Sequence, residues 1–293
     1  MRTPRLLDVD GHTLAAFNYN PDLDSTPIVF IHGFTANIAF WERCQAPLID
    51  KEFRWYSLSL PGHCPAVLPK AFKDTDLTAD LFPEVLIPAI RMLVGDQPVI
   101  LAGHSTGGFA ALLIAEASPD MVKGVMCIGG FCNGNWGAAL GKMQEQVRRG
   151  GLSRLFVEMQ LRMLRLHPKI LKGSLKGHTA DFDAACAWPQ IDAWVADNYV
   201  FTRHLCPNTM IHYLAQMPSI DVADRLTRIT TPTLVLTGEL DAAYPRNEAA
   251  YIHERLPNSQ LVVLEGAGHL PMVERPREYQ DAIADWLAVA QSG

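Results

Sequence analysis

The chain has 293 residues, of which 48% are hydrophobic and 19% are charged. This balance provides for a large apolar core and excludes collagen-like, intrinsically disordered and small disulfide-stapled proteins. The net charge of −6 argues against a nucleic-acid-binding protein. The six cysteines form no CxxC pair, so we expect no zinc ribbon and no disulfide framework. We find no run near the ~18 apolar residues of a membrane span, and we expect a cytoplasmic location.

The first half of the sequence predicts strands and helices in alternation. An antiparallel hairpin is expected over 5–19, with its turn at Asp10-Gly11. Further strands are expected at 28–31, 54–58, 98–102 and 122–128, and helices at 39–49, 77–94 and 106–117. Pro83 and Pro88 predict a bent or split second helix. This alternation is typical of βαβ units in a mostly parallel sheet.

The second half divides into a helical block and a return to alternation. Residues 131–225 show almost purely helical patterns. Strands are then expected at 233–236 and 261–264, and helices at 246–256 and 277–290. We therefore expect an α/β protein with a mostly parallel, doubly wound sheet. Its core is predicted to comprise 1–133 and 226–293, with a helical cap inserted at 134–225 above the carboxyl ends of the strands.

A nucleophilic serine is predicted where the fifth strand meets its helix, in Gly103-His104-Ser105-Thr106-Gly107. A sharp strand-to-helix turn with small neighbours exposes a serine oxygen above the sheet. The alternative is that these glycines only end a strand and let a helix pack closely. The surrounding strand and helix patterns favour the nucleophile.

A serine needs a base to remove its proton, and an acid to orient that base. His269 follows the last predicted strand, and Asp241 follows the strand before it. Glu239 is the competing acid, and no carboxylate lies in 129–136. The N–H groups of Thr106 and Phe34 are candidates for the oxyanion hole.

These motifs together resemble the α/β-hydrolase fold superfamily, and in particular its cap-bearing serine hydrolases. The likeness covers nearly the whole chain. Its elements are Asp8-Val9-Asp10-Gly11, His32-Gly33-Phe34 with Trp41 downstream, Gly103-His104-Ser105-Thr106-Gly107-Gly108, Pro232 to Gly238 with Asp241, and Gly268-His269 before Glu274-Arg275-Pro276. The resemblance implies a triad of Ser105, Asp241 and His269, oxyanion amides at Phe34 and Thr106, and no metal or cofactor. A serine at the elbow, in place of an aspartate, argues against the dehalogenase and epoxide-hydrolase branches.

One loop departs from the family pattern. Relatives often carry Asp-x-x-Gly-x-Gly-x-Ser there, whereas residues 59–66 lack the aspartate, the second glycine and the serine. His63 and Cys64 are interpreted either as neighbours of the pocket or as a surface histidine and a packed cysteine.

The cap combines basic residues with apolar ones. Nine basic and two acidic residues lie between Lys142 and Lys176. They form either a solvated polar face or a docking face for an anionic partner, such as an acidic acyl carrier protein, a coenzyme A phosphate or a membrane surface. The layout is similar to that of pimeloyl carrier-protein methyl esterases, and Arg148, Arg154 and Arg162 are the candidate contacts for a carrier. The residues expected to line an acyl pocket are Phe131, Trp136, Phe156, Met159 and Leu270.

The predicted function is a serine hydrolase that cleaves a carboxylic ester or thioester of a hydrophobic acyl group, as a small molecule or bound to a carrier. The same residues also fit a C–C bond hydrolase or a cofactor-free perhydrolase. A hypothesis of another class is a non-catalytic ligand-binding protein on the same scaffold.

Overall fold

A single eight-stranded sheet forms the centre of the computed structural model, which describes residues 2–244 and 247–290. Its order is β1-β2-β4-β3-β5-β6-β7-β8. The strands are β1 (Arg5–Val9), β2 (His12–Tyr19), β3 (Ile28–Ile31), β4 (Trp55–Leu58), β5 (Val99–His104), β6 (Val122–Ile128), β7 (Thr233–Gly238) and β8 (Ser259–Leu264). β2 pairs antiparallel with β1 and β4, and every pair from β4 to β8 is parallel. The expected α/β fold with a mostly parallel sheet is confirmed.

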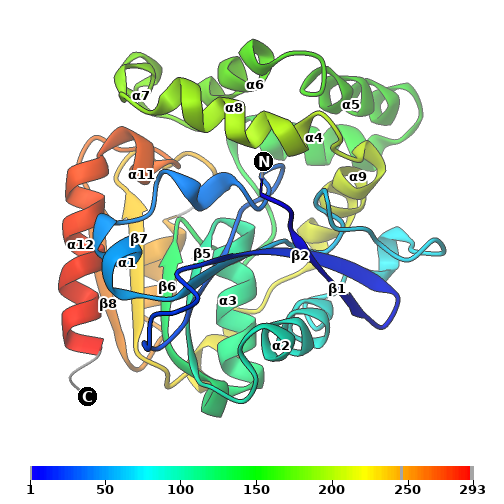
Figure 1. Cartoon of the computed structure of the whole chain (residues 1–293). Coiled ribbons are helices and arrows are strands. Elements are labelled where there is room, and N and C mark those ends of the chain that lie inside the picture. The colour runs from blue at the N-terminus through cyan, green and yellow to red at the C-terminus, as the bar shows by residue number, and fades with distance from the viewer. Residues whose placement is uncertain (1, 245–246, 291–293) are drawn as a thin grey trace.

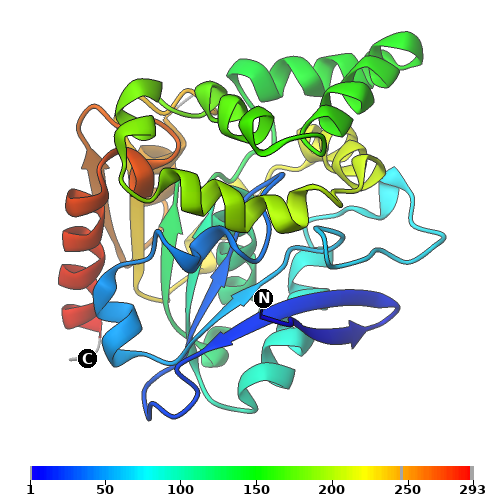
Figure 2. The same ribbon diagram turned by 45° about the horizontal axis from the view of Figure 1, so that its top comes forward.

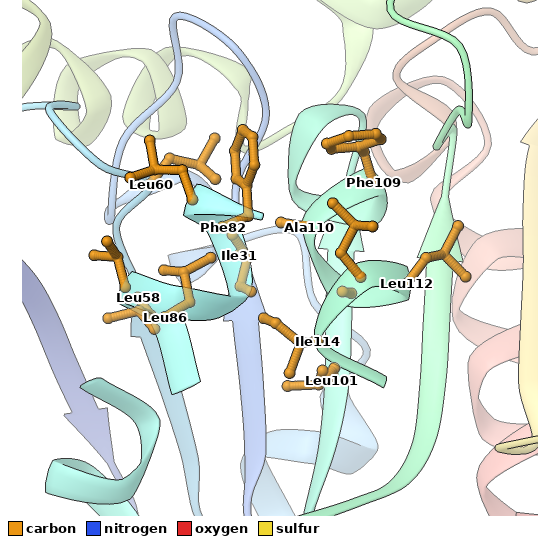
Figure 3. Close-up of a cluster of buried hydrophobic side chains, with 14 of the residues drawn as sticks. Ile31, Leu58, Leu60, Phe82, Leu86, Leu101, Phe109, Ala110, Leu112 and Ile114 are labelled. Carbon is orange, nitrogen blue, oxygen red and sulfur yellow. The ribbon is translucent and has the colours of Figure 1, made fainter. Parts of the chain in front are cut away.

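Both faces of the sheet are covered, as the continuous apolar strands predict. In β3, Val29 and Ile31 belong to one hydrophobic cluster, whereas Ile28 and Phe30 belong to the other. Helices α2 (Leu81–Val94) and α3 (Thr106–Ala117) cover the first face, and Figure 3 shows their side chains against the strands. Helices α1 (Pro47–Glu52) and α12 (Pro276–Ala290) cover the second face (Figure 1). The strands are therefore held between two helical layers.

The segment 134–225, which we call the cap, lies between β6 and β7. Its helices are α4 (Ala138–Arg149), α5 (Gly151–Met163), α6 (Pro168–Ser174), α7 (Phe182–Ala187), α8 (Ile191–Thr202) and α9 (Pro207–Gln216). Figures 1 and 2 show these helices gathered at one end of the sheet. The two ends of the cap meet at its base, where Asn133 and Asp221 form an isolated β-bridge and the Val222 N–H donates to the Cys132 carbonyl at 2.9 Å. The chain thus leaves the core and returns to it at neighbouring points.

Some helices differ from the sequence prediction. The helix expected over 39–49 is instead a 3₁₀ turn, Phe40–Glu42, followed by α1. Pro47 begins α1, because proline fits the first turn of a helix and not its interior. The predicted second helix starts only at Leu81, which puts Pro83 in its first turn and leaves Pro88 inside it.

The last part of the core contains two short helices. α10 spans Glu248–His253, and α11 spans Pro271–Glu274. The expected start of a helix at Arg246 lies outside the described residues. Among the described helices, none combines the length and apolar character needed to cross a bilayer. All six cysteines are free thiols.

Candidate active site

Ser105 occupies the sharp turn between β5 and α3. Its backbone has φ +55° and ψ −118°, a conformation that side-chain-bearing residues seldom adopt. The flanking glycines make the turn sterically feasible, because a Cβ at Gly103 would lie 2.1 Å from the Gly107 carbonyl oxygen. A Cβ at Gly107 would in turn lie 2.2 Å from the Ile31 carbonyl oxygen. The predicted Gly-x-Ser-x-Gly motif therefore forms a strained turn that presents the serine at the carboxyl end of the sheet.

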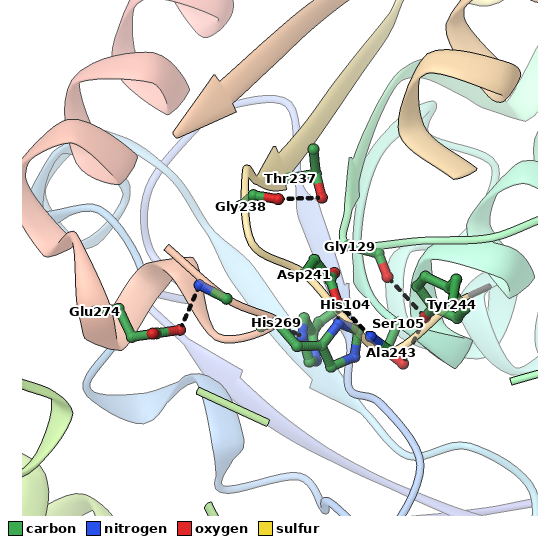
Figure 4. A network of polar contacts seen from close by, with 11 residues as sticks. His104, Ser105, Gly129, Thr237, Gly238, Asp241, Ala243, Tyr244, His269 and Glu274 are labelled. Carbon is green, nitrogen blue, oxygen red and sulfur yellow. Dashed lines mark hydrogen bonds and ion pairs between the residues drawn. The ribbon is translucent and has the colours of Figure 1, made fainter. Parts of the chain in front are cut away.

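His269 and Asp241 meet at the same edge of the sheet, in the loops after β8 and β7. His269 Nδ1 donates to Asp241 Oδ2 at 2.8 Å, and both side chains are almost fully buried (Figure 4). Glu239, the competing acid, instead accepts the Gly266 N–H at 3.1 Å. A Cβ at Gly129, where φ is +52°, would lie 3.3 Å from the His269 ring. Glycine at 129 therefore leaves room for the histidine.

The electrostatics of this pair favour an ionised aspartate. Burial by itself would raise the pKa of Asp241, but the His269 ring and the Ala243 N–H outweigh burial and hold the pKa below its ordinary value. The carboxylate therefore accepts the His269 Nδ1–H, which leaves Nε2 of the ring as the proton acceptor. An imidazolium formed at His269 would be stabilised by the same carboxylate.

Tyr244 is a site residue that sequence reasoning missed. Its hydroxyl donates to the Gly129 carbonyl at 2.9 Å and lies 3.2 Å from Ser105 Oγ (Figure 4). Because that donation uses the single tyrosine proton, the Ser105 hydroxyl is the donor to Tyr244. Over the described part of the chain, no hydrogen bond joins Ser105 to His269. The serine is therefore held at rest by Tyr244, a contact that no local sequence signal indicates.

Two further histidines form hydrogen bonds with the backbone of His269. His104 Nε2 donates to the His269 carbonyl at 2.8 Å, and the His269 N–H donates to the carbonyl of His178, in the cap, at 2.9 Å. Burial lowers the pKa of His104 to about 3 and that of His178 to about 4. Both rings are thus neutral near pH 7, so neither repels a protonated His269.

Glu274 links the His269 loop to the cap, and sequence reasoning assigned it only to a family motif. One carboxylate oxygen accepts the N–H groups of Ala180 and Asp181 at 2.7 and 3.2 Å. The other accepts the N–H of Gly268 at 2.9 Å. A Cβ at Gly268 would lie 2.5 Å from the Ala180 nitrogen, so only glycine allows this close contact. The cap and the His269 loop therefore share one buried carboxylate.

The candidate oxyanion amides belong to two segments that adjoin Ser105, the start of α3 and the loop after β3. Thr106 begins α3, so its N–H is among the first of the helix, which have no intrahelical acceptor. Phe34 follows β3, and a Cβ at Gly33 would lie 3.0 Å from the Ser105 Cβ. The Gly33-Phe34 backbone thus closely approaches the serine. This arrangement fits the two donors that an oxyanion requires.

A cavity of about 80 Å³ opens beside Ser105 and His269. The cap residues that line it are Leu140, Leu171, Ser174, Leu175, His178, Trp194, Asn198 and Thr202. The core contributes Phe34, Phe40 and Leu270, among others. The cavity is therefore mostly apolar, with neutral polar groups and no Asp, Glu, Lys or Arg among its lining residues.

The residues expected to line the acyl pocket are placed differently. Leu270 lines the cavity, whereas Phe131 is stacked on Phe109 inside the core and Trp136 packs against Phe34 and Phe131. The expectation for Phe156 and Met159 is wrong, because both side chains are about half exposed on the outer side of the cap. Helical periodicity correctly places them on one face, but that face points away from the cavity.

The loop 59–66 brings His63 against Phe34, whose N–H is a candidate oxyanion donor. His63 is buried against the rings of Phe34 and Tyr213, and its Nδ1 donates to the Pro61 carbonyl at 3.2 Å. His63 does not line the cavity beside Ser105.

Within 2–244 and 247–290, no cluster of His, Cys, Asp and Glu side chains is arranged to hold a metal ion.

Comparison with known proteins agrees with this geometry. The chain is 26% identical over 269 residues to a pimeloyl-[acyl-carrier protein] methyl ester esterase of Neisseria meningitidis, covering 89% of this chain and 76% of the relative. It is 25% identical over 268 residues to a protein of Pseudomonas savastanoi provisionally named carbamate hydrolase RutD, covering 90% and 94%. A thermophilic esterase from Thermogutta terrifontis has a similar fold, with a TM-score of 0.74, 21% identity and 99% of each chain covered.

A model of the alpha/beta hydrolase family matches residues 28–282, which include Ser105, Asp241 and His269. This match extends from β3 to α12 and so includes the cap. The chain belongs to the alpha/beta hydrolase family and is a hydrolytic enzyme.

Proposed function

We propose that this enzyme cleaves carboxylic esters or thioesters of hydrophobic acyl groups through an acyl-Ser105 intermediate. The observation that carries the proposal is the strained serine turn beside the hydrogen-bonded His269–Asp241 pair, with Ser105 and His269 open to one cavity. The neutral, mostly apolar lining of that cavity supports an uncharged acyl group.

The first half of the reaction forms the acyl-enzyme. The Ser105 hydroxyl leaves Tyr244, passes its proton to His269 Nε2, and Oγ attacks the carbonyl carbon. The N–H groups of Phe34 and Thr106 stabilise the oxyanion of the tetrahedral intermediate. Asp241 stabilises the imidazolium. His269 then protonates the departing alcohol or thiol as the intermediate collapses.

The second half releases the acid. His269 takes a proton from a water molecule, which attacks the acyl-Ser105 carbonyl through a second tetrahedral intermediate. Collapse returns the proton to Ser105 Oγ and frees the carboxylic acid. The low pKa values of His104 and His178, caused by burial, support this cycle, because neither ring is a cation that would oppose the transient charge on His269.

The test is Ser105→Ala with a fluorophosphonate probe and a series of p-nitrophenyl esters from acetate to decanoate. We expect loss of labelling and a fall in ester hydrolysis by several orders of magnitude, on the order of 10⁴-fold or more. The protein must remain folded, as judged by circular dichroism. Persistent labelling of Ser105→Ala would refute the assignment, and a dienone or peroxide substrate turned over faster than every ester would favour the C–C hydrolase or perhydrolase alternative.

A carrier-bound ester is one form of this substrate. The relative from Neisseria meningitidis is named for an ester on an acyl carrier protein, which supports that form. The arginines expected to contact an acidic carrier are Arg148, Arg154 and Arg162, and each already pairs with an acidic side chain of this chain. Changing the three to glutamate is expected to slow turnover of a carrier-bound ester and leave turnover of a small aryl ester unaffected.

The six free thiols support our expectation of a cytoplasmic location.

A further inference from the structure

The outer side of α5 exposes a continuous row of large apolar side chains. Their exposed fractions run from 49% to 85%. The row consists of Leu152, Leu155, Phe156, Met159 and Met163 on α5, with Leu166 in the turn that follows. We call these six residues the α5 stripe. Contiguous exposed apolar surface of this kind is uncommon in monomeric proteins and marks sites of interaction.

Helix geometry explains why the α5 stripe is uncovered. At 3.6 residues per turn, its members fall within an arc of about 100°. Val157 and Leu161 lie on the opposite side of the helix and are fully buried in the cap. One face of the helix therefore packs against α4 and α9, and a second apolar face is exposed to solvent. Figure 1 shows α5 at the margin of the molecule, with no element outside it.

Basic residues lie on α5 and in the segments directly before and after it in the sequence. Between Lys142 and Lys176 there are nine basic and two acidic residues. Arg148 and Arg149 pair with Glu145, Arg162 with Glu158, Arg154 with Asp74, and Lys172 with Asp192. For Lys142 and Lys169, both exposed, the described residues provide no ion pair. The positive charge of this region is therefore only partly balanced within the chain.

We propose that the α5 stripe docks the enzyme on a lipid surface with anionic headgroups. An apolar helix face bordered by lysine and arginine is the pattern of helices that lie in the membrane interface. The apolar side chains would enter the boundary between headgroups and acyl chains, and the basic residues would contact the anionic headgroups. Charge also argues against a second copy of the chain as the occupant, because two such regions would repel each other.

The position of α5 connects this surface with the catalytic cavity. The helices on either side of it in the chain, α4 and α6, contribute Leu140 and Leu171 to the cavity lining. A docked α5 stripe would therefore hold one wall of the cavity close to the lipid. The docking itself is independent of the proposed ester hydrolysis and is measured separately from it.

The experiment is flotation of the full-length enzyme with vesicles of phosphatidylcholine, with or without phosphatidylglycerol. We expect flotation with the anionic vesicles, and less of it at high salt, which screens the headgroups. In the variant Leu152→Gln/Phe156→Gln/Met159→Gln, we expect vesicle affinity to fall by about tenfold or more, because apolar burial dominates interfacial binding. Since all three side chains are exposed, folding and hydrolysis of a small aryl ester without vesicles are expected to stay unchanged.

The matched control is Met92→Gln/Val289→Gln, which removes apolar side chains of comparable exposure from α2 and α12. It is expected to bind vesicles as the unmodified enzyme does, and so is Ser105→Ala, which separates docking from catalysis. Absence of binding to anionic vesicles, or equal binding by the α5 stripe variant, would overturn the proposal. So would a dimer in sedimentation velocity that the stripe variant abolishes, or a loss confined to turnover of a carrier-bound ester. The dimer would assign the stripe to a second copy of the chain, and the carrier-specific loss would assign it to a carrier protein.

Discussion

Helices α5 and α8 of the cap have comparable lengths and apolar contents but opposite surroundings. α8 directs Ile191, Trp194 and Val195 onto the core, and the Trp194 indole donates to the Phe40 carbonyl at 2.7 Å. Trp194 also lines the cavity beside Ser105 and His269. α5 turns its longest apolar row toward the outside. The difference shows that an apolar face fixes the orientation of a helix only where a complementary surface lies within reach.

The same division runs through the rest of the cap. Its site side, α8 and residues 178–181, is hydrogen-bonded to Phe40 and Glu274 of the core, whereas its outer side carries the α5 stripe and basic residues such as Arg148. We therefore expect substitutions on the site side to change both stability and catalysis. Substitutions on the outer side are expected to change neither in the absence of a partner.

The largest contrast is expected between Trp194→Ala and Phe156→Ala. Removing a buried tryptophan costs about 3–5 kcal/mol of unfolding free energy, because of the lost contacts and the cavity left behind. Removing the exposed Phe156 is expected to change that free energy by no more than about 0.5 kcal/mol. Urea unfolding followed by circular dichroism measures both. Similar losses in the two variants would mean that α5 is packed as tightly as α8.

Glu274→Gln tests the link between the cap and the His269 loop. The glutamine amide has the same shape as the carboxylate. Its NH2 group, however, would face a backbone N–H that now donates to a carboxylate oxygen, so two donors would meet. We expect a loss of about 1–3 kcal/mol in unfolding free energy, as for a buried donor left unpaired. Fluorophosphonate labelling of the folded enzyme should also slow, because His269 is displaced. Glu265→Gln, an exposed change in the same loop, is the control. A stability loss without slower labelling would assign Glu274 to structure alone.

Acidification provides a test on the core side whose effect per pH unit is smaller. Burial lowers the pKa of His63 to about 4, below the ordinary value of 6.5. As the pH falls below about 6.5, the unfolded chain binds a proton that the folded chain does not, so stability is full above that pH and declines toward pH 4. His63→Phe is expected to reduce this decline by about 1.4 kcal/mol per pH unit. Urea unfolding at several pH values measures the slope. His204→Phe, at an exposed position, should leave the slope as it is.

The smallest expected effect concerns Tyr244, which contacts Ser105 from the core. Tyr244→Phe removes the acceptor that holds the Ser105 hydroxyl at rest. A hydrogen bond of this kind contributes about 0.5–1.5 kcal/mol, so fluorophosphonate labelling is expected to accelerate about two- to tenfold. Tyr56→Phe removes a buried hydroxyl away from the site and is the control. Unchanged or slower labelling in Tyr244→Phe would show that Tyr244 does not restrain the serine.

Much of the candidate site was predictable because the relevant signals are local. Parallel strands bring their carboxyl ends to one edge of the sheet, so residues that follow β5, β7 and β8 meet there. Ser105, Asp241 and His269 lie there for this reason. Tyr244 and Glu274 were not assigned roles at the site, because the contacts of Tyr244 with Ser105 and of Glu274 with the cap join residues more than ninety positions apart in the sequence. No periodicity or motif encodes such pairs.

The sequence by itself determined which residues share a face or an edge. Continuous apolar strands required cover on both sides, and small residues around Ser105 allowed a strained turn, because both follow from backbone geometry and side-chain size. Only the tertiary structure decided what each face meets. The periodicity of α5 placed Phe156 and Met159 together, but the folded cap turned them outward, because the shape and distance of neighbouring elements select which of two apolar faces is buried.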